Sequence, residues 1–196
     1  MFSRKEQIIQ RTGKHGVGRY DFLKLLKTEF ESSTSREAKK QVLANLANFA
    51  YDPVNYDYLR QLGIIDLFLH VLSESDRTLV RFAIGGICNL CLDPINKEYI
   101  SQNQGINLVS SLLTSNDEQT ILSAITTLMF LITRTSKKDI TNPAIIQKIQ
   151  QFSNDSNKRI KNLADIFLAD YCNAEDLEQA KKTANTDSLE NIPLPT

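Results

Sequence analysis

Two cysteines three positions apart are the residues whose spacing most readily suggests chemistry in this chain. Cys88 and Cys91 lie in the stretch CNLCLDP, and a Cys-x-x-Cys pair is typical of both zinc sites and thioredoxin-type redox sites. A zinc site needs further ligands, for which the remaining candidates are His15, His70 and Cys172. Three cysteines are an odd number, which favours free thiols over a disulfide framework in an intracellular chain.

The glycine-rich stretch GKHGVGRY (13–20) is a second candidate, because glycines can cradle a phosphate group. It lacks the Lys-Ser/Thr ending of a P-loop, and no predicted strand precedes it. We interpret it as a mobile lead-in to the first helix. The sequence also contains no nucleophile elbow, no HExxH motif and no paired-carboxylate motif. We therefore predict a protein that is not an enzyme and that holds no cofactor or metal ion.

The charge balance weighs against direct, non-specific binding to nucleic acid. Lys and Arg together number 23, as do Asp and Glu, so the formal net charge is zero. Two basic clusters keep direct RNA binding open as an alternative: Lys137 with Lys138, and Lys158, Arg159 with Lys161. No apolar run approaches the ~18–20 residues of a membrane span, and residues 1–20 contain no segment like a signal peptide. The sequence predicts a soluble intracellular protein that does not bind a membrane.

Apolar residues recur at three- and four-residue steps along most of the chain, which is typical of helices. Only 7 Gly and 5 Pro interrupt the pattern. Four segments are too apolar for one-sided surface helices, namely 41–50, 78–92, 120–132 and 159–172. We therefore predict that each of them lies inside a layered, all-helical stack.

The same pattern recurs at a fixed spacing, and this repeat is the strongest signal in the chain. LANFAYDPVNYDYLRQLGIIDLF (46–68) aligns with ICNLCLDPINKEYISQNQGINLV (87–109) at a spacing of 41 residues, since 89 − 48 = 41 for the paired asparagines. A third copy follows at the same spacing, and a fourth follows at 40. A repeat of roughly 40–47 residues with two or three helices in each unit is the signature of HEAT and armadillo proteins.

Each unit is predicted to contain three helices. A short helix at 55–62 ends at Gly63, a second follows at 64–72, and a longer third helix at 76–91 ends near Asp-Pro. Gly63 suits a bend because a residue without a Cβ allows positive φ and close helix approach. An inserted residue in the next copy aligns Gly63 with Gly105, and Gly18 takes the same place in the first copy.

The terminal units depart from this pattern. A first helix of the first unit can come only from SRKEQIIQR. In the fourth unit TRTSKKDITNP reads as a loop, with Asn142 as the cap of the next helix and Pro143 at its first position. Residues 173–185 predict a short capping helix that begins at Asn173. The segment SLENIPLPT beyond it either binds a partner groove in extended form or is a disordered end.

The three-helix unit, its bend glycine and the Asn-Leu pair of its third helix resemble the armadillo repeat. The resemblance covers residues 18 to 173 and implies an all-α fold, a short right-handed α-solenoid of about four repeats. We expect a flexible N-terminus over 1–17, an armadillo-repeat domain over 18–173, and a short helix with a Pro-containing tail over 174–196.

The repeat also gives the cysteine pair an interpretation. The preceding unit has alanines at the two positions of Cys88 and Cys91, and the next unit has Met129 and Ile132. The thiols therefore stand where other units have apolar side chains, and buried cysteine behaves as a small hydrophobe. We predict that both are core residues with no metal-binding or redox role.

In an armadillo stack the third helices line a concave groove, and the Asn of the Asn-Leu pair projects into it. Regular asparagines can hold the backbone of an extended peptide through paired hydrogen bonds; the alternative is that they only satisfy neighbouring helix ends. Our candidate partner-binding residues are Gln41, Asn45, Asn48, Phe82, Asn89, Phe130 and Asp170. Nuclear-import receptors of this fold pair such asparagines with Trp, which this chain lacks, so we expect a different kind of partner.

A closer resemblance rests on ANLANFAYDP, GGICNLC and the C-terminal IPLP, which are not part of the general repeat consensus. Together they resemble one family of small armadillo proteins associated with the minor spliceosome, which removes U12-type introns. The resemblance implies a nuclear scaffold that pairs with an RNA-recognition-motif protein and other spliceosomal proteins, and that contacts small nuclear RNA only indirectly. The alternative is a general armadillo adaptor that binds an extended peptide in an unrelated pathway.

Overall fold

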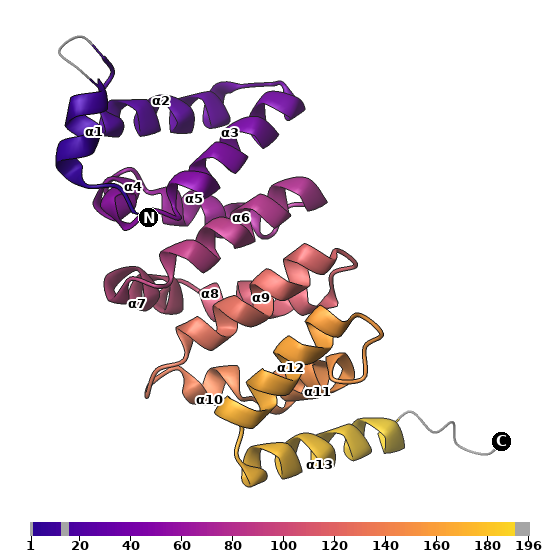
Figure 1. The fold of residues 1–196 in the computed structure, drawn as a ribbon. Helices are drawn as coiled ribbons and strands as arrows, with labels where there is room; N and C mark the ends of the chain where they lie inside the picture. The colour runs from indigo at the N-terminus through magenta and orange to yellow at the C-terminus, as the bar shows by residue number, and fades with distance from the viewer. Residues whose placement is uncertain (1, 13–15, 191–196) are drawn as a thin grey trace. The chain divides into compact units, whose positions relative to one another are not determined.

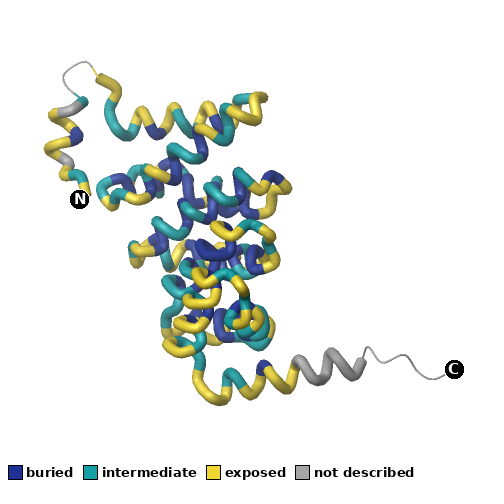
Figure 2. Tube along the Cα trace, turned by 45° about the vertical axis from the view of Figure 1, so that its right-hand side comes forward, coloured by how far each residue is buried: buried dark blue, intermediate teal, exposed yellow. Residues whose placement is uncertain are grey.

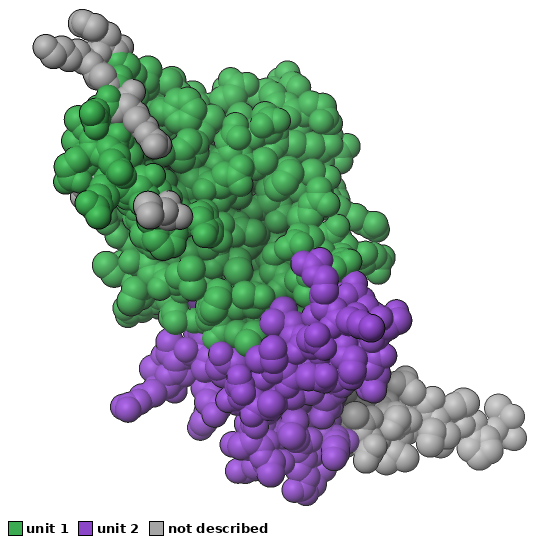
Figure 3. All heavy atoms as spheres, viewed as in Figure 1, with its two compact units in different colours: residues 1–130 green, residues 131–196 purple. Residues whose placement is uncertain are grey.

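The chain folds into helices joined by short turns (Figure 1). The computed structural model describes residues 2–12 and 16–190, without the side chains of Lys5, Arg11 and 184–190, and no strand occurs in those ranges. Two compact units divide the chain, Met1–Phe130 and Leu131–Thr196 (Figure 3). The helices of unit 1 are α1 (Lys5–Thr12), α2 (Arg19–Ser32), α3 (Arg36–Phe49), α4 (Tyr56–Gln61), α5 (Ile64–Val71), α6 (Arg77–Leu90), α7 (Pro94–Gln102), α8 (Gly105–Ser111) and α9 (Glu118–Leu131), whose last residue belongs to unit 2. The helices of unit 2 are α10 (Lys137–Ile140), α11 (Pro143–Phe152), α12 (Lys158–Tyr171) and α13 (Ala174–Glu190).

The predicted repeat sets the helix boundaries of unit 1. The third helices α3, α6 and α9 begin at residues 36, 77 and 118 and each has 14 residues, so their spacing is 41 (77 − 36 and 118 − 77). Side-chain caps begin all three. The Ser35 hydroxyl accepts a hydrogen bond from Ala38 N–H, the Asp76 carboxylate accepts from Thr78 N–H, and the Asp117 carboxylate accepts from Thr120 N–H. Figure 1 shows the three helices following one another along unit 1. The predicted all-helical class and its 41-residue repeat are confirmed in the described ranges.

Apolar side chains on the inner faces of these helices form the core of unit 1. Leu43, Leu46, Ile84 and Ile87 are all fully buried, and Figure 2 shows buried positions interspersed with half-buried or exposed ones along the helices of unit 1. Buried positions at helical spacing are what the sequence periodicity predicted. The side of α6 and α9 opposite the core is mostly half-buried rather than exposed, as expected for helices inside a layered stack.

The turn that follows each third helix is held by a repeated polar contact. The buried Asn55 side chain donates a hydrogen bond to the Phe49 carbonyl oxygen at 2.8 Å. At a spacing of 41 residues, the buried Asn96 donates to the Leu90 carbonyl oxygen at 3.1 Å. Each asparagine satisfies a carbonyl group that is left without an intrahelical partner where the helix ends. The contact thus ties one third helix to the first helix of the next repeat.

The bend before the second helix of a repeat confirms one prediction and corrects another. Gly63 has φ = 64°, as expected for a bend glycine. In the next repeat the left-handed residue is Gln104, with φ = 62°. The spacing therefore stays at 41, and the alignment of Gly63 with Gly105 through an inserted residue is wrong. Gly105 instead begins α8, where a Cβ would lie 2.4 Å from the Ile100 carbonyl oxygen, so a close backbone approach requires this glycine.

The first repeat keeps the spacing of 41 residues but lacks the bend. The Arg19 guanidinium lies 3.5 Å from Asn55 Oδ1, and its counterpart Arg60 donates to Asn96 Oδ1 at 2.8 Å. Arg19 therefore corresponds to Arg60, and the alignment of Gly18 with the bend glycine is wrong. Gly18 has φ = −60°, and α2 continues through the position where the later repeats bend.

Residues 1–17, expected to be a flexible N-terminus, include α1, which lies where SRKEQIIQR predicted a helix. Ile8 is buried, and Ser3 N–H donates a hydrogen bond to Asp52 Oδ2 at 3.0 Å. The Phe2 ring lies against Tyr51, with 5.6 Å between ring centroids. Residues 13–15 of the glycine-rich stretch are outside the described part of the chain. The domain boundary at residue 17 stays a prediction.

Unit 2 begins its helices as the sequence predicted. Asn142 caps α11 and Pro143 takes its first position. Asn173 accepts a hydrogen bond from an N–H group in the first turn of α13, at 2.8 Å. The segment predicted as a loop contains the one-turn helix α10 at 137–140. The helix α13 packs on α11, with Ala180 fully buried, so α13 covers α11 in this unit.

Candidate peptide-binding face

Three positions of each third helix in unit 1 share one side of that helix, and we call this surface the third-helix face. Positions three, four or seven residues apart lie on the same side of a helix. The face comprises Gln41, Ala44 and Asn48 on α3, Phe82, Gly85 and Asn89 on α6, and Ser123, Thr126 and Phe130 on α9. All of these except the buried Ser123 are half-buried or exposed. The face is therefore accessible to a partner.

Small residues form the middle row of this face. A Cβ added at Gly85 would meet nothing within 4 Å, whereas one added at the adjacent Gly86 would lie 2.5 Å from the Phe68 ring. Gly86 thus allows α5 to pack closely on α6, and Gly85 leaves open space on the outer side of the same helix. Its neighbours in the row, Ala44 and Thr126, are also small. A backbone can approach closely where side chains are missing.

The two asparagines of the face differ in their hydrogen bonds. The Asn89 amide donates to the Ala47 carbonyl oxygen at 3.3 Å, across two repeats. Ala47 lies in the last turn of α3, so Asn89 satisfies a helix end, which is the alternative role that the sequence left open. Asn48 is exposed, and its side chain has no hydrogen-bond partner within the described ranges. No third helix precedes α3, which leaves the Asn48 amide without the partner that Asn89 has.

The third-helix face carries no formal charge. Arg81, which precedes Phe82, lies over the Phe82 ring with its guanidinium carbon 5.6 Å from the centroid. The same guanidinium is 3.6 Å from Asp117 Oδ1. This pairing and the absence of acidic residues among the nine members of the face leave amide and aromatic groups as its recognition elements. Such groups suit the backbone and apolar side chains of a peptide.

Two of the candidate residues lie apart from the others. The 41-residue spacing pairs Asn45 with Gly86 (86 − 45 = 41), which is buried against the second helix of its repeat. Asn45 is accordingly half-buried, at the margin of the face. Asp170 is exposed near the end of α12 and belongs to unit 2. The remaining candidates, Gln41, Asn48, Phe82, Asn89 and Phe130, all lie on the third-helix face of unit 1.

Sequence reasoning missed two exposed apolar residues beside the asparagines. Tyr51 is 61% exposed and Leu92 is 55% exposed, each three positions after an asparagine of the face. They occupy equivalent positions in consecutive repeats, since 92 − 51 = 41. The repeat spacing, together with an apolar type at both positions, was the signal that could have found them. They extend the candidate surface with apolar contact area.

The surroundings of the cysteine pair disfavour the thiolate form of both residues. Cys91 is fully buried, as predicted, and its Sγ lies 3.1 Å from the Cys88 carbonyl oxygen. Cys88 is only half-buried, so the prediction that both are core residues is correct for Cys91 alone. Burial raises the pKa of the Cys91 thiol far above its ordinary value. Burial also raises the pKa of Cys88, although a hydrogen bond to Thr127 acts in the opposite direction. Thiols that remain protonated at neutral pH are weak nucleophiles and weak metal ligands.

Metal-ligand clusters and membrane-spanning helices are two further kinds of functional feature. Within residues 2–12 and 16–190, no group of three or more His, Cys, Asp or Glu side chains is placed to hold a metal ion. No helix of that same part of the chain combines the length and the apolar content needed to cross a bilayer.

Solved structures similar to this chain are armadillo repeat proteins. A computationally designed armadillo repeat protein for modular peptide recognition has a TM-score of 0.71 and 16% identity, over 86% of this chain and 73% of that one. A designed armadillo repeat protein in complex with the peptide (KR)4 has a TM-score of 0.71 and 17% identity, over 94% of this chain and 77% of that one. The repeat spacing, the bends and these likenesses together define the class: the chain is an armadillo repeat protein.

The particular family follows from sequence similarity. No protein-family model matches the chain. Armadillo repeat-containing protein 7 of Mus musculus is 56% identical over 181 residues, which is 91% of this chain and 91% of that protein. The chain belongs to the armadillo repeat-containing protein 7 family. The resemblance that the sequence motifs indicated is thereby confirmed.

Proposed function

We propose that this chain is a non-enzymatic scaffold that binds an extended segment of a partner protein on its third-helix face. The observation that supports this most directly is the exposed Asn48 amide, which has no hydrogen-bond partner in the described part of the chain. It lies beside the row of small residues, where the space over Gly85 is open. An amide group both donates and accepts, so it pairs with the backbone of a peptide whatever its sequence. The uncharged face favours a segment with apolar side chains over a run of Lys and Arg.

Two substitutions test this use of the face without disturbing the core. Asn48→Ala removes the free amide, and Gly85→Arg fills open space, so the variants retain the fold. Partner capture from cells, followed by identification of the proteins that co-purify, should be weakened by each variant. Asn162→Ala is a matched control, because Asn162 is exposed on α12 in unit 2. Unchanged capture by both variants excludes the third-helix face as the binding site.

Asn89→Ala is a less direct test of the same face. It removes the hydrogen bond to Ala47 and is expected to destabilise the chain by about 1 kcal/mol. A double variant with Asn48→Ala therefore needs a measured unfolding midpoint beside the binding result. If the chain is folded and partner capture falls further in the double variant than in Asn48→Ala, the two asparagines share the interaction.

For the biological role, we propose an accessory component of the minor spliceosome that works in the nucleus. In this role the chain pairs with an RNA-recognition-motif protein and other spliceosomal proteins in the splicing of U12-type introns, and small nuclear RNA is contacted through the partner. Membership of the armadillo repeat-containing protein 7 family supports this proposal, and the balanced charge of the chain agrees with a partner that carries the RNA. Depletion of the protein should raise the retention of U12-type introns and leave major-class introns unchanged. Retention of both classes alike contradicts the role.

Two alternatives are separated by direct measurement. A general adaptor of another pathway co-purifies with partners that have no spliceosomal component. A direct RNA binder retains RNA as a purified chain, with an affinity that falls with salt and falls further when Lys137 and Lys138, or Lys158 and Lys161, are changed to Ala.

A further inference from the structure

The N-terminal end of unit 1 exposes a concentration of large apolar side chains. Of the ten exposed large apolar side chains in the described ranges, five lie within the first 25 residues: Phe2, Ile9, Val17, Phe22 and Leu25. In a repeat stack each unit covers its neighbour, and the outer side of the first unit has no neighbour to cover it. An apolar terminal surface of this kind marks an interaction site.

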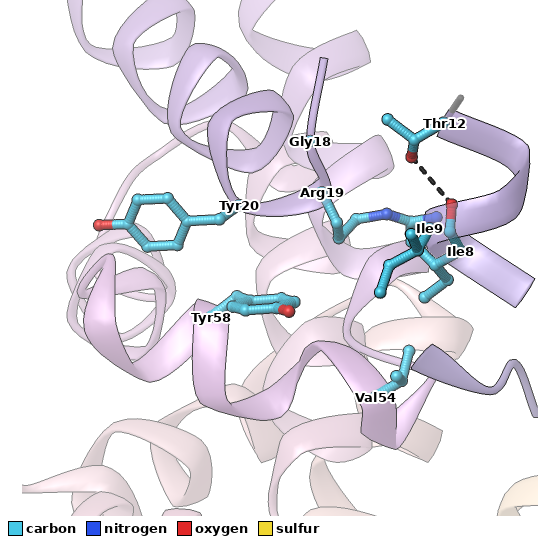
Figure 4. A pocket seen from close by; sticks show the side chains of 8 residues that line it. All are labelled: Ile8, Ile9, Thr12, Gly18, Arg19, Tyr20, Val54 and Tyr58. Atoms are coloured by element: carbon cyan, nitrogen blue, oxygen red, sulfur yellow. Dashed lines mark hydrogen bonds between the residues drawn. The ribbon is translucent and has the colours of Figure 1, made fainter. Parts of the chain in front are cut away.

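A pocket of about 320 Å³ opens beside one of these residues, Ile9, between α1, the start of α2, and α4 (Figure 4). Ile8, Val54 and the aromatic pair Tyr20 and Tyr58 contribute to its lining, with 6.1 Å between the two ring centroids. Ile9 also lines it and is 71% exposed. The volume lies within the roughly 300–1,000 Å³ of ligand pockets, and the lining suits aliphatic side chains. An occupant would therefore insert apolar groups between α1 and α4.

The segment that forms this end is basic. Residues 1–20 contain five Lys or Arg residues (4, 5, 11, 14 and 19) and one acidic residue, Glu6, which gives a net charge of +4. The Arg19 side chain lines the pocket itself. An occupant that combines aliphatic anchors with acidic residues complements this end in both respects.

We propose that the pocket binds the C-terminal segment of a second copy of this chain, residues 183–196. The segment TANTDSLENIPLPT contains two acidic residues and no Lys or Arg, a net charge of −2. Leu189, Ile192 and Leu194 supply aliphatic anchors, and two prolines restrict the chain so that less conformational freedom is lost on binding. Residues 183–190 are the last part of α13, so Ser188, Leu189 and Glu190, predicted to be extended or disordered, are helical; residues 191–196 are outside the described part of the chain.

The contact is heterologous, because it joins two different surfaces of identical chains. Such a contact links copies head to tail and either closes into a ring or continues as a chain. The average mass of the protein in solution therefore rises with its concentration. Opposite charges at the two surfaces make the association weaker at high salt, where they are screened.

The first experiment uses a fluorescein-labelled synthetic peptide of residues 183–196, titrated with the full chain while anisotropy is measured. Ile9→Asp places a carboxylate at the pocket and should weaken peptide binding at least about tenfold, which corresponds to about 1.4 kcal/mol. Ile95→Asp is the matched control, because Ile95 is similarly exposed at 61% but lies on α7. The peptide with Ile192→Asp and Leu194→Asp should bind no better than a scrambled sequence.

The second experiment measures the mass of the full chain by sedimentation equilibrium over a range of protein concentrations. Association should be lost in Ile9→Asp and in the full chain with Ile192→Asp and Leu194→Asp, and mixing these two variants should not restore chains longer than a dimer. Excess free peptide should dissociate the wild-type assembly. A chain that is monomeric at every concentration overturns the proposal, as does peptide binding that Ile9→Asp leaves unchanged. If peptide binding is lost in Asn48→Ala or Gly85→Arg instead, the segment binds the third-helix face and not the pocket. This result also overturns the proposal.

Discussion

Gln104 is the residue at which local geometry and residue type disagree most in the described part of the chain. It has φ = 62°, whereas the equivalent position in the preceding repeat is Gly63. A left-handed conformation costs a residue with a Cβ roughly 1–2 kcal/mol. Gly105, the next residue, closely approaches Ile100, four residues before Gln104, and this close approach across the bend fixes the direction of the chain there.

Replacement of this residue by glycine should therefore stabilise the protein. We expect Gln104→Gly to raise the free energy of unfolding by about 0.5–1 kcal/mol, because relief of strain exceeds the greater flexibility of glycine in the unfolded chain. Urea unfolding followed by circular dichroism measures the effect. The control Gln102→Gly, in the last turn of α7, should destabilise by about 0.5–1 kcal/mol. Equal effects of the two substitutions would contradict the left-handed conformation at Gln104.

At the scale of the element, α6 places two glycines side by side with opposite roles. Gly85→Ala adds a methyl group where nothing lies within 4 Å, and Gly86→Ala adds one that would lie 2.5 Å from the Phe68 ring. We expect Gly85→Ala to stabilise by about 0.5–1 kcal/mol, the difference in helix propensity. Gly86→Ala should destabilise by about 1–3 kcal/mol, because it overpacks the α5–α6 contact. Thermal unfolding of the two variants tests the orientation of the helix, which is wrong if their signs are the reverse.

The start of α6 depends on the charge of Asp76. Burial by itself raises the pKa of this carboxyl. The opposing effects are larger, so the pKa is lowered overall: they are the hydrogen bond from Arg36, the hydrogen bonds from the N–H groups of Thr78 and Leu79, and the positive charge of Arg36. The folded pKa lies below the unfolded value of about 3.9, so the ionised cap contributes stability above the unfolded pKa, and this contribution is lost as pH falls through the folded pKa.

Asp76→Asn should therefore destabilise the protein near neutral pH and cease to do so in acid, since asparagine keeps the cap but has no charge. Unfolding midpoints of both proteins from about pH 7 to below pH 3 should converge as the wild-type carboxylate is protonated. Arg36→Ala should cost less than about 1 kcal/mol, because the Arg36 side chain is 71% exposed. A gap that widens in acid would show that the charge is not stabilising.

The elements were predictable where the repeat is regular, and the errors arose where it is not. The 41-residue spacing located α3, α6 and α9 because each occupies an equivalent environment. The bend at Gln104 was missed because alignment by glycine assumes that only glycine adopts positive φ. The hydrogen bond from Asn89 to Ala47 depends on the distance between two helices, which residue types do not fix. The free amide of Asn48 is the complementary case, since it follows from the position of α3 at the start of the stack.

At the scale of the whole molecule, stability in a repeat protein is a sum of repeats and of the interfaces between neighbours. Arg60 occupies one such interface in unit 1. Its guanidinium donates to Asp93 Oδ1 and to Asn96 Oδ1, both at 2.8 Å, and it is also paired with Asp57. Asn96 in turn holds the end of α6, so Arg60 connects the first helices of two repeats with the third helix between them.

Loss of Arg60 should therefore weaken the coupling between repeats more than the repeats themselves. We expect Arg60→Ala to destabilise by about 1–3 kcal/mol, because Asn96 Oδ1 loses its donor while the residue stays buried. Arg60→Lys should recover only part of this, since one nitrogen of the guanidinium donates to Asp93 and Asn96 while the other is paired with Asp57, and an ammonium group has a single nitrogen. Hydrogen exchange should rise in α4 and α7 beyond the rise in α5, and the urea dependence of unfolding should become shallower as cooperativity falls. Arg134→Ala, an exposed position in unit 2, is the control. The contrary result is a uniform rise in hydrogen exchange across unit 1 with an unchanged urea dependence of unfolding. It would mean that the repeats unfold as one cooperative block. Arg60 would then stabilise this block without determining the coupling between its repeats.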